Sequence, residues 1–211
     1  MLAWLRDLFQ PKPKAPIHDL DGLGEFIAAH SAFISQKATL DYCRARAGVM
    51  WIKLFEDERF RDALDYCRWE SYAAVLADVC EVTQIYLRRR EVPEAPLPEL
   101  LTRLARGALL RYPIPAHRRD WEDRLEALNR RLERANLAQP RPVHMVGYAC
   151  GEAVFELLPI HTNLREHDRE HVVNNLRFFL VQYHVELERL ARPEALRAAV
   201  LRELPPSVSQ S

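Results

Sequence analysis

The stretch from Glu58 to Arg90, ERFRDALDYCRWESYAAVLADVCEVTQIYLRRR, is the clearest indication of the fold in the sequence. It contains no proline, so nothing in it removes a backbone donor from a helix. Mostly small and apolar residues recur along it at intervals of three and four, which places them on one helical face. These residues are Phe60, Leu64, Cys67, Ser71, Ala74, Asp78, Val82 and Ile85. We therefore predict one long helix that packs against others through this face.

Prolines and Gly48 divide the remaining chain. Because proline clashes with the preceding turn of a helix, we expect the proline clusters after Val92 to fall between helices. The predicted helices are residues 20–46, 58–90, 97–112, 115–137, 143–158, 162–191 and 193–204. Alternating strand patterns are missing. The sequence thus predicts an all-α, single-domain bundle of six or seven helices over residues 17–204. An apolar and Pro/Lys-containing segment (1–16) precedes the bundle, and a disordered tail (205–211) follows it.

Composition excludes several classes of protein. The chain has 211 residues, of which 48% are hydrophobic, and this is enough to bury a core without disulfides or metals. Basic and acidic residues number 30 each, so no net charge draws the chain to nucleic acid. No apolar stretch reaches the roughly 18 residues that span a bilayer, and no secretory signal opens the chain. We predict a cytoplasmic protein without a nucleic-acid partner or a cofactor.

The last third of the chain contains a short histidine motif. His167 and His171 bracket Glu170 in the H-x-x-E-H pattern of inverted zinc peptidases. Those enzymes need another carboxylate ligand from a distant helix, whereas Glu186 and Glu188 lie on the same predicted helix, roughly 20 Å or more away. A looser metal site remains as an alternative, and its ligands would be His161, His167, His171 and Glu152. Structural or solvated histidines are the competing interpretation.

Two further features have a structural and a functional interpretation. Asp78 lies on the apolar face of the long helix, and a buried carboxylate needs a partner, for which Arg44 or Arg46 are candidates. A structural ion pair competes here with a ligand pocket. Gly147 and Gly151 lie four residues apart, where they would let another helix approach closely. No nucleophile elbow and no phosphate-binding glycine motif appears.

The nine residues from Met1 to Phe9 are strongly apolar and precede a Pro-Lys-Pro-Lys run. Such a segment suits a membrane interface or the groove of a partner, and it suits packing on its own bundle equally well. Membrane contact through a segment of this length with few cations is weak. A location at the periphery of the inner membrane is therefore the alternative to a purely cytoplasmic one.

Several blocks of the chain carry a resemblance to a known family. They are Tyr42-Cys-Arg-Ala-Arg-Ala-Gly48, Leu54-Phe-Glu-Asp-Glu-Arg-Phe60, Leu158-Pro-Ile160 and Asp168-Arg-Glu-His-Val-Val-Asn-Asn-Leu-Arg-Phe178. In these blocks the chain resembles a family of small helical proteins of alphaproteobacteria, some of which carry an "esterase" label. The resemblance implies that the shared elements are Arg44, Arg46, Gly48, Phe55, Glu56, Asp57, Asp168, Asn174 and Arg177. The histidines are not part of that pattern. The sequence contains no catalytic serine motif that would support the "esterase" label.

We conclude from the sequence that the chain is a non-enzymatic helical protein that binds another protein or forms a homodimer. No catalytic residue is proposed. The interaction candidates are Arg44, Arg46, Glu56, Asp57, Asp78, Asp168, Asn174 and Arg177. Asn174 and Arg177 are three residues apart, so they share a helix face. A metal-dependent enzyme and a peripheral membrane protein remain the alternatives.

Overall fold

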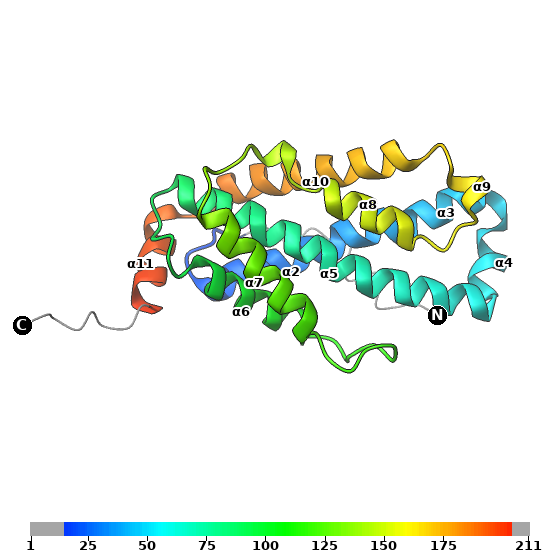
Figure 1. Ribbon diagram of the computed structural model, residues 1–211, viewed down its shortest axis with the longest axis horizontal. Helices are drawn as coiled ribbons and strands as arrows, with labels where there is room; N and C mark the ends of the chain where they lie inside the picture. The colour runs from blue at the N-terminus through cyan, green and yellow to red at the C-terminus, as the bar shows by residue number, and fades with distance from the viewer. Residues whose placement is uncertain (1–14, 204–211) are drawn as a thin grey trace, which may run out of the picture.

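The computed structural model describes residues 15–203, and within them the chain is a bundle of helices without strands (Figure 1). The all-α prediction is confirmed. In chain order the helical elements are α2 (Leu20–Gln36), η1 (Lys37–Asp41), α3 (Tyr42–Ala47), η2 (Gly48–Met50), α4 (Trp51–Glu56), α5 (Glu58–Arg89), α6 (Leu97–Leu109), α7 (Glu122–Asn136), η3 (Val143–Met145), α8 (Tyr148–Leu157), α9 (Thr162–Arg165), α10 (Arg169–Leu190) and α11 (Pro193–Glu203). None of these helices is long and apolar enough to cross a membrane.

Helix α5 is the longest helix of the described chain and runs along the long axis of the molecule (Figure 1). Its 32 residues give it a length of about 48 Å at the usual helical rise. Asp57 starts it, because the Asp57 carboxylate accepts a hydrogen bond from the Phe60 N–H at 2.8 Å. In Figure 1, α8 and α10 lie along one side of α5, and α6 and α7 lie toward the other side. Apolar side chains from all of these helices form one buried cluster, in which Tyr86 and Tyr183 are the largest fully buried residues.

The helix α2 runs alongside α5 and is continued by a π turn. Asp19 starts α2 by accepting a hydrogen bond from the Gly22 N–H at 2.7 Å. The π turn η1 follows α2 directly, and α3 then runs to Ala47. Gly48 ends this continuous run of helix, because its φ of +52° lies in a region that residues other than glycine rarely adopt. The predicted helix over residues 20–46 is therefore present, with one wide turn inside it.

Three predicted helix bounds were wrong. The predicted helix 115–137 begins only at Glu122, because the chain before it forms an irregular loop that is held by ion pairs to α5. The predicted helix 143–158 is a short η3 turn followed by α8 from Tyr148, with Gly147 at φ +92° between them. The predicted helix 162–191 is divided into α9 and α10 at residues 166–168. The described residues thus contain more segments than the six or seven helices predicted.

The start of the described chain contacts the end of α10. The Ile17 N–H donates to the Leu190 carbonyl at 2.9 Å, and the Arg192 N–H donates to the Ile17 carbonyl at 3.0 Å. This pair of hydrogen bonds ties the start of the bundle to the junction of α10 and α11. The apolar segment Met1 to Phe9, for which membrane contact is one alternative, and the predicted tail 205–211 lie outside the described residues.

Candidate functional site

Four consecutive apolar residues are exposed where the chain turns from α3 into α4. They are Val49, Met50, Trp51 and Ile52, and we call them the apolar corner. Val49 is 93% exposed and Ile52 is 55% exposed. Elements α3, α4 and α9 lie together at one end of the long axis of the molecule (Figure 1), and α9 exposes Leu164 there. Single exposed apolar residues are common on protein surfaces, whereas a run of four is typical of an interaction site.

Aromatic and cationic side chains hold the apolar corner in place. The Arg44 guanidinium lies over the ring of Trp51, 5.4 Å from its centroid, and 5.9 Å from that of Phe55. The Trp51 and Phe55 rings pack edge to face with centroids 5.9 Å apart, and Phe55 packs on the buried Phe60. The exposed corner is therefore joined to the core by a continuous stack.

Arg46 and Asp168 are brought together at the same end of the molecule. The Arg46 Nε lies 3.0 Å from the Asp168 Oδ2, and the Tyr42 hydroxyl donates to the same oxygen at 2.7 Å. Burial and the hydrogen bond to Asp168 raise the pKa of Tyr42 well above its usual value, so this hydroxyl stays protonated. The structure thus brings three of the candidates, Arg44, Arg46 and Asp168, to the end of the molecule that carries the apolar corner, although Asp168 lies far from the two arginines in the sequence.

The acidic candidates Glu56 and Asp57 lie at the junction of α4 and α5. Asp57 is the N-cap of α5, which is a structural role. Glu56 is exposed at the end of α4, and Glu58 is exposed in the first turn of α5. This run of acidic side chains lies only a few residues beyond the apolar corner along the chain.

Asn174 and Arg177 share a face of α10, as predicted. The Arg177 Nη1 donates to the Asn174 Oδ1 at 3.2 Å. The Arg177 Nε and Nη2 also donate to the His144 carbonyl, at 3.0 and 2.7 Å. This arginine therefore ties η3 to α10.

Asp78 is buried, but the partner expected for it was wrong. Its Oδ1 accepts a hydrogen bond from Arg131 of α7, not from Arg44 or Arg46, because those two arginines lie beside the apolar corner. Burial raises the pKa of Asp78 even though Arg131 opposes this shift. The Cys150 thiol is also buried beside Asp78, and burial together with this carboxyl raises the pKa of the thiol. The structural interpretation of Asp78, as half of an internal ion pair, fits these contacts.

Glu81 is a second buried carboxylate, one helical turn after Asp78, and the sequence did not single it out. Its exposed fraction is 2%. It accepts hydrogen bonds from the Arg131 Nε and the Arg141 Nε, both at 2.6 Å. Arg131 thus bridges Asp78 and Glu81.

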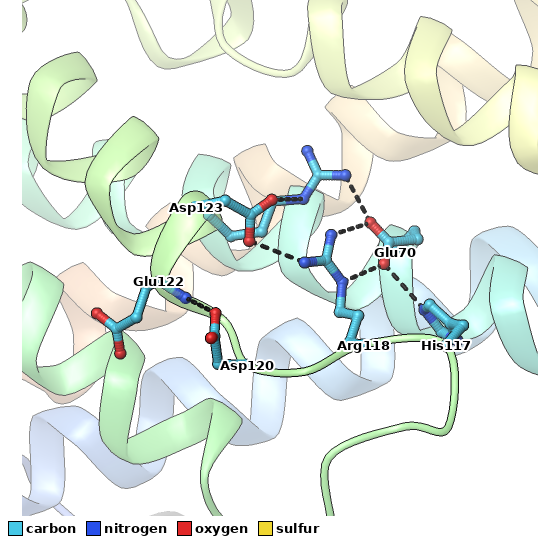
Figure 2. Close-up of polar contacts among 7 residues, drawn as sticks. Glu70, His117, Arg118, Asp120, Glu122 and Asp123 are labelled. Atoms are coloured by element: carbon cyan, nitrogen blue, oxygen red, sulfur yellow. Dashed lines mark hydrogen bonds and ion pairs between the residues drawn. The ribbon is translucent and has the colours of Figure 1, made fainter.

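A third buried carboxylate, Glu70, contacts two arginines and a histidine (Figure 2). Its exposed fraction is 3%. The Arg118 Nη2 donates to the Glu70 Oε2 at 2.7 Å, the Arg118 Nε donates to Oε1, and the Arg124 Nη2 donates to Oε2. The His117 Nε2 lies 3.0 Å from Oε1. Burial alone would raise the pKa of Glu70, but these hydrogen bonds outweigh burial and lower it to about 2.

The acidic residues of α5 and the arginines of α7 recur at matching intervals, which explains the ion pairs between the two helices. On α5, Glu70 and Asp78 are eight residues apart, and on α7 their partners Arg124 and Arg131 are seven apart. Both spacings are about two helical turns, so the acidic row faces the basic row. The signal is present in the sequence as acidic residues on the otherwise apolar side of α5. Nothing local, however, shows which arginines pair with them.

The alternative metal site is not assembled. His161 caps α9, since the Asn163 N–H points to its Nδ1 at 3.4 Å, and His167 is exposed. His171 lies 3.1 Å from the Asn175 amide, and Glu152 forms an ion pair with Arg169 at 2.7 Å. Among residues 15–203, no three His, Cys, Asp or Glu side chains converge as metal ligands do. In the described residues the four alternative ligands instead lie on separate elements, α8, α9, the segment after it and α10, each with contacts of its own or exposed.

Comparison with known proteins gives no match to a family model, to a curated protein or to a solved structure. The resemblance to the alphaproteobacterial helical family therefore stays a prediction.

Proposed function

We propose that this chain is an accessory protein that binds another protein through the apolar corner. The observation that carries the proposal is the exposure of Val49, Met50, Trp51 and Ile52 as one uninterrupted run. Exposed apolar surface costs free energy in water, about 25 cal/mol for each Å², and binding recovers it. A partner that covers the four side chains provides this gain.

The packing of Trp51, one of the four residues of the apolar corner, supports binding to a preformed site. Arg44, Trp51 and Phe55 stack on one another and on the core, so little side-chain freedom is lost when a partner covers them. Tryptophan and arginine are also the residues most enriched among those that contribute most to binding energy. The corner therefore has the composition of an interaction site.

The charges beside the corner favour a protein over a lipid surface. A loop that inserts into an anionic membrane is usually flanked by lysine and arginine. Here Lys53 follows the corner directly and the exposed Glu56 and Glu58 come after it, while the nearby Arg46 forms an ion pair with Asp168, so charges of both signs lie beside the corner. Anionic lipid would repel the acidic run, whereas a protein groove can offer charges of both signs around an apolar floor.

The size of the corner favours a different protein over a second copy of this chain. Weak or transient complexes between different proteins bury less than about 1,200 Å² in total, whereas permanent homodimer interfaces bury roughly 2,000 Å² or more. Four side chains at the end of an elongated molecule contribute only part of such an area (Figure 1). We infer that the partner supplies a concave groove into which the corner inserts.

Site-specific photo-crosslinking in the native host tests this proposal. A benzophenone amino acid replaces Ile52 in one variant and, as the control, Leu137 in the loop after α7, which is 89% exposed. We expect one protein to crosslink from position 52 and not from position 137, and we expect Val49→Asp to abolish that crosslink. The identified protein must then bind the purified chain. Crosslinks to lipid, to the chain itself, or with equal yield from both positions contradict the proposal.

The peripheral-membrane alternative rests on Met1 to Phe9 and has its own test. Flotation with vesicles of phosphatidylcholine and phosphatidylglycerol compares the full chain with a variant that lacks these nine residues. Flotation that depends on the nine residues supports membrane attachment, and equal flotation of both proteins excludes it. Flotation that is lost in Val49→Asp instead assigns the apolar corner to lipid and refutes the protein-binding proposal.

A further inference from the structure

A pocket of about 340 Å³ lies between α2 with its π turn and α5, away from the apolar corner. Ala32 and Leu40 line it on one side, and Trp69 and Tyr72 of α5 line the other. Tyr112, from the loop after α6, completes the wall. This volume and this apolar lining are typical of small-molecule sites.

Three aromatic rings form one wall of the pocket. The centroids of Trp69 and Tyr112 are 5.6 Å apart, and those of Tyr72 and Tyr112 are 6.2 Å apart, both in edge-to-face arrangements. The Tyr72 hydroxyl is engaged with the Ala108 carbonyl at 3.3 Å. The aromatic wall therefore offers an apolar surface to a ligand, and polar recognition must come from the other residues that line the pocket.

Gln36 also lines the pocket. It lies where α2 passes into the π turn, and such turns are frequent at functional sites. Its amide nitrogen Nε2 is buried and has no hydrogen-bond partner among the described residues. A buried N–H without an acceptor is unfavourable, and a ligand oxygen would satisfy it. The nearby Thr39 hydroxyl, in contrast, already donates to the Ser35 carbonyl at 2.8 Å.

Arg68 supplies a positive charge to the same pocket. Its ion pair with Asp65 is 3.5 Å long, and Asp65 is half exposed. Burial lowers the pKa of Arg68 from its ordinary value, which reports the loss of water around the guanidinium, yet an arginine remains charged near neutral pH. A guanidinium in apolar surroundings binds a carboxylate more strongly than it would in water.

We propose that this pocket binds a monocarboxylic acid with an apolar body. The carboxylate accepts hydrogen bonds from Arg68 and Gln36, and the apolar body lies against Trp69 and Tyr112. Arg68 is the one cationic side chain among the residues that line the pocket, and its guanidinium has five N–H donors, so it can bind a ligand carboxylate beside its contact with Asp65, whereas a phosphate monoester would bring a second negative charge. This site is separate from the apolar corner and does not depend on it.

Isothermal titration of the purified full chain with octanoate and with 1-octanol tests the proposal. The two probes share an apolar chain, and only octanoate carries a charge. We expect octanoate to bind saturably with one site per chain, and 1-octanol to bind at least about tenfold more weakly. Absence of saturable octanoate binding, or equal affinity for acid and alcohol, overturns the proposal.

Two variants test separately the charged part of the site, at Arg68, and the apolar part, at Ala32. We expect Arg68→Gln to weaken octanoate binding about tenfold, to the level of 1-octanol, and Arg61→Gln on the exposed side of the same helix to leave it unchanged. Ala32→Phe fills the pocket, so it should abolish the binding of both probes while helical content by circular dichroism stays the same. If Arg68→Gln fails to fold, Ala32→Phe decides alone: full octanoate binding in that variant refutes the site.

Discussion

Arg118 and Glu70 form a two-point ion pair that joins the loop before α7 to the middle of α5. The Arg118 Nη2 donates to the Glu70 Oε2 at 2.7 Å, and the Arg118 Nε donates to Oε1. Arg118 also donates to the Asp123 Oδ1 at 2.8 Å, and so reaches the first turn of α7. A single buried carboxylate on α5 thus positions both the irregular loop and the start of the next helix.

Removing the charge of Glu70 should destabilise the fold. In Glu70→Gln the guanidinium groups of Arg118 and Arg124 lose their buried counter-charge, and we expect the free energy of unfolding to fall by about 3 kcal/mol. Urea denaturation followed by circular dichroism measures this change. Glu122→Gln is the matched control, because Glu122 pairs with Arg106 on the surface, where solvent screens the pair and little change is expected. Equal effects of the two substitutions would falsify the structural role of Glu70.

The same carboxylate predicts how stability depends on pH. The pKa of Glu70 is about 2 in the folded chain, below its ordinary value of 4.5. The stabilisation from its ionised form is therefore present in full above pH 4.5 and is lost as the pH falls from 4.5 to 2. Unfolding free energies measured across this range should decline more steeply for the natural chain than for Glu70→Gln. Parallel declines contradict the prediction.

Asp78 should respond differently from Glu70. Burial raises the pKa of Asp78, so the folded state favours its neutral form relative to the unfolded state. A neutral isostere is then tolerated, and Arg131 keeps Glu81 as a counter-charge. We expect Asp78→Asn to change the free energy of unfolding by no more than about 1 kcal/mol in the same urea experiment. A loss as large as that in Glu70→Gln refutes this interpretation.

The contact between α8 and α10 depends on Gly151. A β-carbon at Gly151 would lie 3.0 Å from the Cα of Val173, so α8 and α10 would have to move apart. We expect Gly151→Ala to lower the free energy of unfolding by about 2 kcal/mol. Gly107 in α6 has open space around it, and Gly107→Ala should stabilise the helix by about 0.5 kcal/mol. Thermal unfolding of both variants checks whether the two substitutions change stability in opposite directions. Stabilisation by Gly151→Ala would contradict the close approach of α8 to α10.

The prediction of the fold succeeded where local chemistry decides the structure. The absence of proline over α5 and the apolar spacing along it predicted the central helix, and the close approach expected at Gly151 is confirmed. It was wrong where distant contacts decide. Nothing near Pro115 shows that the loop before α7 stays irregular, because Glu70, some 50 positions earlier in the chain, holds Arg118.

The candidate site was predicted only in part. Arg44, Arg46 and Asp168 were named from a resemblance, and their convergence required the packing of α3 against the segment between α9 and α10. The exposure of Val49 and its neighbours was not predicted, since apolar residues in a sequence are usually assigned to a core. The four apolar residues directly after Gly48 were a signal for this exposure, because a glycine break at that position ends the helix and changes the direction of the chain.

The affinity between this chain and the protein that crosslinks at position 52 shows whether the apolar corner is the docking surface. The exposed Val49 makes little contribution to folding, so Val49→Asp changes the surface and leaves the bundle intact. With both proteins purified, we expect Val49→Asp to raise the Kd at least about tenfold, equivalent to about 1.4 kcal/mol, and Leu137→Asp to leave it unchanged. A Kd that is the same for the natural chain and for Val49→Asp would contradict the claim that the apolar corner is the docking surface.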